Sequence, residues 1–190
     1  MAGTRKPLEE LQKCCLKGVQ SAFKKHHQFT GGYSLRQAPE AFIQGEMACA
    51  MGRAKHFVTL ESGVKMLLQA AGAEMRGRKP RNGRIDLAVW WKGDRPRYVI
   101  EVKKVFSNDS ITSDAKRLRQ VLGRKGTLRR GLVVVYSDAA KIETLESRFD
   151  AIADKSNTTV REKTTVYEFV DNLQRVRYWQ AACFVVKPRQ

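Results

Sequence analysis

The sequence lacks the patterns that mark several classes of protein. It has no run of about 18 apolar residues that could cross a membrane, and no pattern typical of a signal peptide or a lipid anchor. Its four cysteines form no C-x-x-C pair, so neither a structural zinc site nor a disulfide framework is indicated. A P-loop, a dinucleotide-binding fingerprint, an H-E-x-x-H motif and internal repeats are also absent. We therefore expect an intracellular protein, cytoplasmic or associated with a nucleoid or nucleus.

Acidic residues are scarce relative to basic ones. The 190 residues include 36 Lys and Arg but only 19 Asp and Glu, which gives a formal net charge of +17. This excess predicts a polyanionic partner, because lysine and arginine gain affinity by displacing counterions from phosphates. We expect that partner to be nucleic acid and not a membrane. The length, with 42% hydrophobic residues, is typical of one domain with a sizeable core.

Hydrophobic periodicity predicts an α/β domain in which helices and strands alternate. Helices are expected at Pro7 to about Lys25, Pro39 to about Ala54, Val64 to Ala71, Asp109 to Gly123 and Ala139 to about Asp154. Strands are expected at 55–61, 84–91, 97–105 and 131–137, followed by a C-terminal pair at 158–169 and 175–186. One domain over residues 1–190 is therefore expected, divided into an N-terminal helix and linker (1–35), a core (36–138), and a helix with a C-terminal β-hairpin (139–190).

The segment from Arg84 to Val105 carries the most informative pattern. Two runs rich in β-branched and aromatic residues flank a short stretch with Gly, Asp and Pro, which predicts a β-hairpin. If Gly93-Asp94 is a two-residue turn, residues whose numbers add up to 187 lie opposite each other. Asp86 then faces Glu101, unless a longer loop shifts the register. The other face of the first strand is expected to carry Ile85, Leu87, Val89 and Trp91.

Asp86, Glu101 and Lys103 would then crowd one patch of a largely apolar sheet. Two carboxylates this close are unfavourable unless a cation or the lysine offsets their charge. Such a pair suits a hard divalent metal ion with oxygen ligands. The alternative is an ordinary solvated sheet face with charges at every second position, and the alignment of the two acids favours a site.

These residues resemble the signature of the PD-(D/E)-x-K phosphodiesterases, the restriction-endonuclease-like superfamily. That signature has an acidic residue on one strand and (D/E)-x-K on the next, here Asp86 and Glu101-Val102-Lys103, with Ile85 in place of the proline. The resemblance covers residues 39–138. It implies a restriction-endonuclease-like core of helix, three strands, helix and strand with a mixed sheet, and a metal-dependent nuclease acting on DNA.

The resemblance also implies a cofactor and roles for particular residues. Mg²⁺, with Mn²⁺ able to substitute, would be held by Asp86, Glu101 and the Val102 carbonyl, and Lys103 would orient the attacking water. A further acid, which would add a metal ligand or hold the water shell, is expected from the helix that precedes the first core strand. Glu40 points into the apolar stripe of that helix and is the expected residue, although an acid in a first turn is also explained by the helix dipole. Glu46 lies at the edge of the stripe and needs no partner.

Basic residues near this hairpin are expected to contact the phosphates of nucleic acid. The loop from Arg76 to Arg84 precedes Asp86, which favours a phosphate clamp over a solvated loop. The expected contacts are Arg76, Arg78, Lys79, Arg81, Arg84, Lys104, Lys116, Arg117, Arg119, Arg124 and Lys125. An RNA-directed nuclease and a non-catalytic basic nucleic-acid-binding or regulatory subunit remain as alternatives. A homodimer or a larger nuclease complex is also open.

Overall fold

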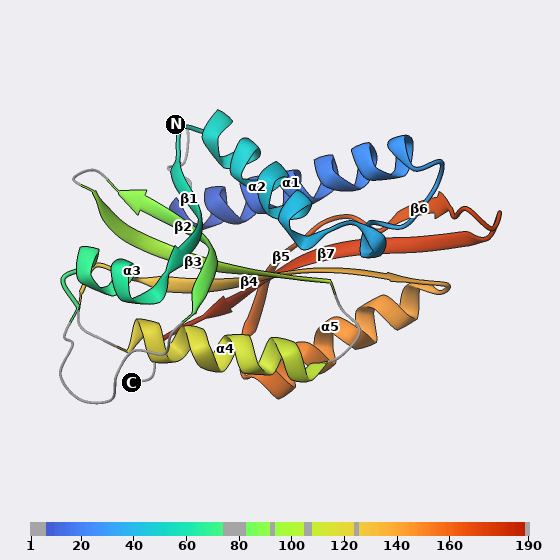
Figure 1. Cartoon of the computed structure of the whole chain (residues 1–190). Coiled ribbons are helices and arrows are strands. Elements are labelled where there is room, and N and C mark those ends of the chain that lie inside the picture. The colour runs from blue at the N-terminus through green and yellow to red at the C-terminus, as the bar shows by residue number, and fades with distance from the viewer. Residues whose placement is uncertain (1–6, 74–82, 92–93, 105–107, 124–125, 189–190) are drawn as a thin grey trace, which may run out of the picture.

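A mixed β-sheet lies between two layers of helices in the computed structural model, which describes residues 7–73, 83–91, 94–104, 108–123 and 126–188 (Figure 1). The elements in chain order are α1 (Pro7–Phe29), the 3-10 helix η1 (Leu35–Gln37), α2 (Glu40–Arg53), β1 (Phe57–Gly63), α3 (Val64–Ala70), β2 (Arg84–Trp91), β3 (Arg95–Lys104), α4 (Asn108–Leu122), β4 (Arg130–Ala139), α5 (Ile142–Ser156), β5 (Thr159–Lys163), β6 (Tyr167–Val170) and β7 (Val176–Val186). The predicted α/β class is confirmed. No helix in these ranges is long and apolar enough to cross a membrane.

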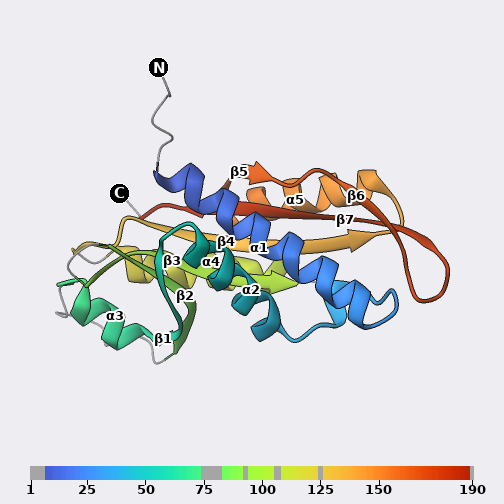
Figure 2. The same ribbon diagram turned by 90° about the horizontal axis from the view of Figure 1, so that it is seen from above.

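The sheet has seven strands in the order β1-β2-β3-β4-β7-β5, with β6 also paired to β7. β3 and β4 run parallel, and the other paired strands run antiparallel. Side chains of α1 and α2 form the core on one face, and those of α3, α4 and α5 form the core on the other. Figure 2 looks down on the first face, where α1 crosses above β4 and β7.

The predicted strand at 131–137 is buried on both faces, as its continuous apolar run indicated. Leu132 and Val134 pack against α1 and α2, whereas Val133 and Val135 pack against α4 and α5. All four are fully buried. Burial on both faces is typical of a strand in a parallel pair that helices cover on both sides.

The register of β2 and β3 agrees with the prediction over three pairs, Leu87 with Ile100, Ala88 with Val99 and Val89 with Tyr98. The predicted two-residue turn is wrong, however, because Trp91 pairs with Arg95 and three residues separate the strand ends. The register shifts by one residue between Val89 and Trp90, and this bulge restores the predicted pairing beyond the longer turn. Asp94, in the turn, has a φ of 55°, a left-handed conformation that aspartate tolerates.

One face assignment on β2 is also wrong. Leu87 and Val89 pack toward α1 and α2, but Ile85 packs toward α3 and α4 on the opposite face. The alternation breaks at Asp86, next to Glu61 of the neighbouring strand. Glu61 has a φ of 49° and therefore interrupts the regular ladder between β1 and β2. Asp86 thus sits at an irregular point of the sheet.

The C-terminal region forms three strands instead of the predicted pair. The stretch expected as one strand is divided into β5 and β6, because Thr164 between them bonds Ala181 through both its backbone N–H and its hydroxyl. These strands extend the sheet, since β7 lies between β4 and β5 and pairs antiparallel with β6. The first core strand also begins later than predicted, at Phe57, because Lys55 has a φ of 64°.

Candidate active site

Asp86 on β2 and Glu101 on β3 lie beside each other inside the protein. Glu101 is 0% exposed and Asp86 is 9% exposed. Asp86 Oδ2 accepts a hydrogen bond of 2.7 Å from the backbone N–H of Val102, which holds this carboxylate against the neighbouring strand. Neither oxygen of Glu101 has a hydrogen-bond partner among the residues that the structure describes. The hairpin therefore brings the two predicted acids together, and Oε2 of Glu101 has neither a hydrogen-bond nor an ion-pair partner among the described residues.

Burial makes the charged forms of both acids costly. Burial raises the pKa of Glu101 to about 9, and the neighbouring Asp86 charge adds to this effect while Arg117 opposes it. Burial also raises the pKa of Asp86, against the lowering effects of the Val102 N–H and Lys103. Two carboxylates in this position do not both ionise readily unless a further cation joins them.

Lys103, two residues after Glu101, carries its ammonium between two helices. Its Nζ lies 3.4 Å from an oxygen of Glu40 on α2 and 3.4 Å from an oxygen of Asp114 on α4. Burial alone would lower the pKa of Lys103, but the carboxylates of Asp114, Glu40, Asp86 and Glu101 together raise it. The ammonium is therefore held in its charged form beside the two buried acids.

The two acids of α2 differ from their predicted surroundings. Glu40 lies at the start of the helix with its side chain 34% exposed, so it is not in the middle of the buried stripe. Its described partner is the Lys103 ammonium, at 3.4 Å, and its role as a metal ligand stays a prediction. Glu46 was expected to need no partner, which is wrong: Lys25 and Ser21 of α1 each donate to it at 2.7 Å. Glu46 instead joins α1 to α2 and is only 12% exposed.

The sequence did not predict that two residues of α4 contact Lys103 and Glu101. Asp114 forms an ion pair with Lys103, and Arg117, expected to contact nucleic acid, lies with its Nη2 2.5 Å from Glu101 Oε1. Both positions border the apolar stripe of α4, because Asp114 comes three residues after Ile111 and Arg117 four residues before Val121. That spacing indicates that they face the sheet.

Several other predicted phosphate contacts are already engaged within the protein. Lys104 donates to the carbonyl of Ala38, and Arg119 donates to the carbonyls of Ser156 and Asn157 at the end of α5. Lys116 on α4 and Arg84 at the start of β2 are exposed. The remaining predicted contacts, Arg76, Arg78, Lys79, Arg81, Arg124 and Lys125, lie outside the described residues.

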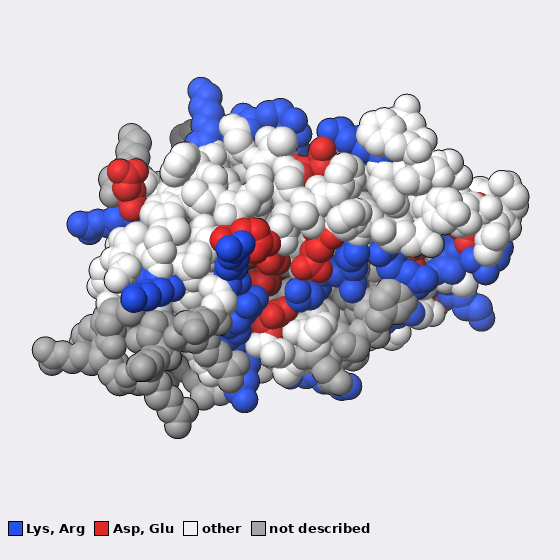
Figure 3. Space-filling model, viewed as in Figure 1, with Lys and Arg blue, Asp and Glu red and all other residues white. Residues whose placement is uncertain are grey.

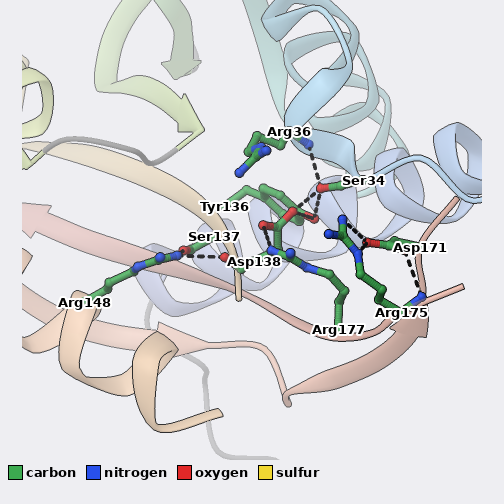
Figure 4. Close-up of polar contacts among 9 residues, drawn as sticks. All are labelled: Ser34, Arg36, Tyr136, Ser137, Asp138, Arg148, Asp171, Arg175 and Arg177. Carbon is green, nitrogen blue, oxygen red and sulfur yellow. Dashed lines mark hydrogen bonds and ion pairs between the residues drawn. The ribbon is translucent and has the colours of Figure 1, made fainter. Parts of the chain in front are cut away.

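A buried network anchors the segment that leads into Glu40. Asp138, at the end of β4, accepts hydrogen bonds from the hydroxyl of Ser34, from Tyr136 Oη at 3.4 Å and from Arg177 Nη2 at 3.0 Å. Figure 4 shows these side chains converging on Asp138, with Arg148 nearby. Arg148 donates to the carbonyl of Asp138 at 2.7 Å. Because Ser34 caps η1, this network fixes the chain just before α2 begins.

Carboxylates and cations gather on the side of the molecule where an edge of the sheet lies between α2 and α4. Figure 3 shows Asp and Glu side chains gathered near the middle of this face, with Lys and Arg on either side. Within the described ranges, no three His, Cys, Asp or Glu side chains are grouped closely enough to hold a metal ion by themselves. Any metal held here would therefore depend on two protein carboxylates and other oxygen ligands.

Comparisons of the chain with models of protein families, with curated proteins and with solved structures give no match.

Proposed function

We propose that this chain is a metal-dependent nuclease that hydrolyses phosphodiester bonds in DNA. The observation that carries the proposal is the pairing of Asp86 with Glu101, both buried, with Lys103 on the same strand as Glu101. The order of elements supports a restriction-endonuclease-like core, because α2 is followed by β1, β2, β3, α4 and β4, with the short α3 inserted after β1. The choice of DNA over RNA rests on the resemblance alone.

The donor atoms fit Mg²⁺. This ion prefers oxygen ligands and is often bound by only one or two carboxylates, with water and substrate phosphate completing its coordination. Asp86 and Glu101 would supply the carboxylates, and Oε2 of Glu101 has no hydrogen-bond or ion-pair partner among the described residues. Val102 as a carbonyl ligand stays a prediction. Bound there, Mg²⁺ would polarise the phosphate and acidify a water molecule.

The remaining residues position charge around the phosphate. Lys103 places a fixed positive charge beside the two acids, where negative charge develops on the phosphate during hydrolysis. Glu40 and Asp114 hold the Lys103 ammonium from two sides and so restrict where it can point. Because β3 and the two helices are packed elements, this arrangement exists before substrate binds.

A second candidate is a nucleic-acid-binding subunit that has the fold but does not cleave. The ion pair between Arg117 and Glu101 favours this candidate, since a guanidinium stands beside a carboxylate that the nuclease needs for metal binding. The net charge of +17 agrees with either function, because both need affinity for phosphates.

Cleavage assays separate the two candidates. Purified protein is incubated with duplex DNA, single-stranded DNA and RNA in Mg²⁺, in Mn²⁺ and in excess EDTA. We expect hydrolysis of DNA with either metal and none in EDTA. Binding to DNA without hydrolysis in any metal would identify the non-catalytic subunit, and hydrolysis of RNA alone would correct the substrate.

Matched substitutions assign the hydrolysis to this site. Asp86→Asn and Glu101→Gln should abolish cleavage while DNA binding persists, because the phosphate contacts lie elsewhere. Asp150→Asn and Glu146→Gln make the same chemical changes at exposed positions of α5 and should leave cleavage unchanged. Equal activity in all four variants would place the hydrolysis outside the Asp86–Glu101 pair.

A further inference from the structure

Arg117 on α4 is paired directly with one of the two buried acids, Glu101. Its Nη2 lies 2.5 Å from Glu101 Oε1 and 3.5 Å from Asp114 Oδ1. Glu101 is completely buried, so this guanidinium is the charge nearest to its oxygen among the ion pairs of the described residues. In electrostatic terms Arg117 acts on Glu101 as a metal ion would, because a positive charge beside a buried carboxyl favours its ionised form.

We propose that Arg117 is a resident cation that competes with metal for Glu101, so that the ion pair must open before this carboxylate can bind a metal ion. This inference rests on the proposed function and describes how its site is regulated. A metal ion on either oxygen of Glu101 would stand within a few ångströms of the Arg117 guanidinium, and two cations this close in a buried site repel each other strongly. Metal binding and the Arg117–Glu101 pair therefore oppose each other.

The contacts of Arg117 allow it to leave. Its side chain is 26% exposed, so one end already reaches solvent. Its Nε is buried without a hydrogen-bond partner among the described residues, and its bond to the Arg84 carbonyl is long, at 3.2 Å. The Glu101 contact is an ion pair without good hydrogen-bond geometry, because both Glu101 oxygens also lack a hydrogen-bond partner among those residues. The pair is thus held by charge more than by directional bonds.

Nucleic acid would favour the open arrangement. A phosphate at the acids offers the released guanidinium a new partner, and arginine binds phosphate through two parallel hydrogen bonds. Substrate would then draw Arg117 away from Glu101 and raise the affinity of Glu101 for metal. By thermodynamic linkage, metal would raise the affinity for nucleic acid by the same factor.

Calcium binding by calorimetry tests the competition without any need for cleavage. The proteins compared are the wild type, Arg117→Met and Lys116→Met, the last of which removes one charge from the same helix at an exposed position. We expect Arg117→Met to bind Ca²⁺ at least about tenfold more tightly than the wild type, because the competing charge lies within a few ångströms of the ligand. Lys116→Met should change the affinity by much less.

A second arm tests the coupling to substrate. A short duplex with non-hydrolysable phosphate linkages should tighten Ca²⁺ binding by the wild type and have a smaller effect on Arg117→Met, where no guanidinium is left to transfer. Arg117→Gln removes the charge but keeps a shorter polar side chain, and it carries the same two expectations should the methionine variant not fold.

The outcomes distinguish the inference from the proposed function. Equal or weaker Ca²⁺ binding by a folded Arg117 variant, with clear binding by the wild type, overturns the competition and leaves the nuclease proposal intact. No Ca²⁺ binding by the wild type or by any folded Arg117 variant, with or without duplex, overturns the nuclease proposal and the inference with it. An equal gain in Ca²⁺ affinity for Lys116→Met and Arg117→Met would also overturn the inference, because net charge alone would then explain the effect.

Discussion

Lys103 is the residue whose chemical role is most clearly separable from metal binding. Its ammonium lies 3.4 Å from Glu40 and from Asp114, and it is not among the oxygen donors that a hard metal ion requires. Lys103→Met should therefore lower the cleavage rate by roughly 10²-fold or more, the usual cost of losing a preorganised charge, while Ca²⁺ affinity stays within a few-fold of the wild type. Single-turnover cleavage and calorimetry measure the two quantities. Wild-type rates in the variant would show that the E-x-K pattern is accidental.

Glu101 should make the stability of the metal-free protein depend on pH. Its pKa is raised from 4.5 to about 9, so the folded protein holds this proton more tightly than the unfolded chain does. The resulting stabilisation is complete below pH 4.5 and is lost as the pH rises toward 9. In EDTA we expect the free energy of unfolding to fall by at most about 1.4 kcal/mol per pH unit in this window, or about 3–6 °C in Tm.

Thermal unfolding of Glu101→Gln provides the check. This variant cannot ionise at position 101, so its Tm should vary less between pH 5 and about 9 than that of the wild type. Glu146→Gln, at an exposed position, should retain the wild-type dependence. A wild-type Tm that rises over this range would contradict the assignment of a raised pKa to Glu101.

The proximity of Asp86, Glu101 and Lys103 could be predicted from the sequence because the pairing of two strands joined by a short turn is a local property. The partners of these residues could not be predicted in the same way. Whether Arg117 points at Glu101 or at solvent depends on how α4 packs against the sheet, and its helical spacing permitted either. The break in alternation at Asp86 was equally hidden, since it lies opposite Glu61, a residue with a positive φ on a different strand.

At the scale of elements, the contact between α1 and α2 changes the expected roles of two glutamates. Glu46 joins the helices through Lys25 and Ser21, whereas Glu40 contacts Lys103. Glu46→Gln should therefore lower the free energy of unfolding by about 1 kcal/mol with cleavage unchanged, because a charged hydrogen-bond acceptor is removed away from the acids. Glu40→Gln should slow cleavage with little loss of stability. Chemical denaturation and cleavage rates measure both effects, and the reverse pattern would move the functional acid to Glu46.

Helix bounds were predicted better from the sequence than the order of strands in the sheet. Helices with a clear apolar stripe, such as α4 and α5, were found within a few residues of their predicted bounds. Strand order was not predictable from periodicity, because period two gives the faces of a strand but not its neighbours. The position of β7 between β4 and β5 is a result of long-range pairing, and the division of β5 from β6 depends on bonds from Thr164 to Ala181 on that strand.

At the scale of the whole molecule, the excess of cations should make nucleic-acid binding steeply dependent on salt. The segment 74–82 lies outside the described residues, so its role as a phosphate clamp stays a prediction. Neutralising Arg78, Lys79 and Arg81 together should reduce the slope of log K against log salt by about 0.9 for each phosphate of duplex DNA that the variant no longer binds. Fluorescence anisotropy over a range of salt concentrations measures the slope.

The control for this prediction neutralises three exposed cations at the other edge of the sheet. Lys155 at the end of α5 and Arg161 and Lys163 on β5 lie beyond β7, on the side of the sheet away from β2. Their removal makes the same change in net charge and should have a smaller effect on the slope. Equal slopes for the two triple variants would show that the 74–82 segment is not a clamp.

The central claim is that Asp86 and Glu101 together hold a divalent metal ion beside a phosphate. The most direct test is a crystal structure of the protein with Mn²⁺ and a short duplex, using the anomalous scattering of manganese to locate the ion. We predict an anomalous peak between the carboxylates of Asp86 and Glu101, with the Arg117 guanidinium moved away from Glu101. Nucleic acid bound on this face with no manganese at the two carboxylates, and Arg117 still paired to Glu101, would contradict the claim.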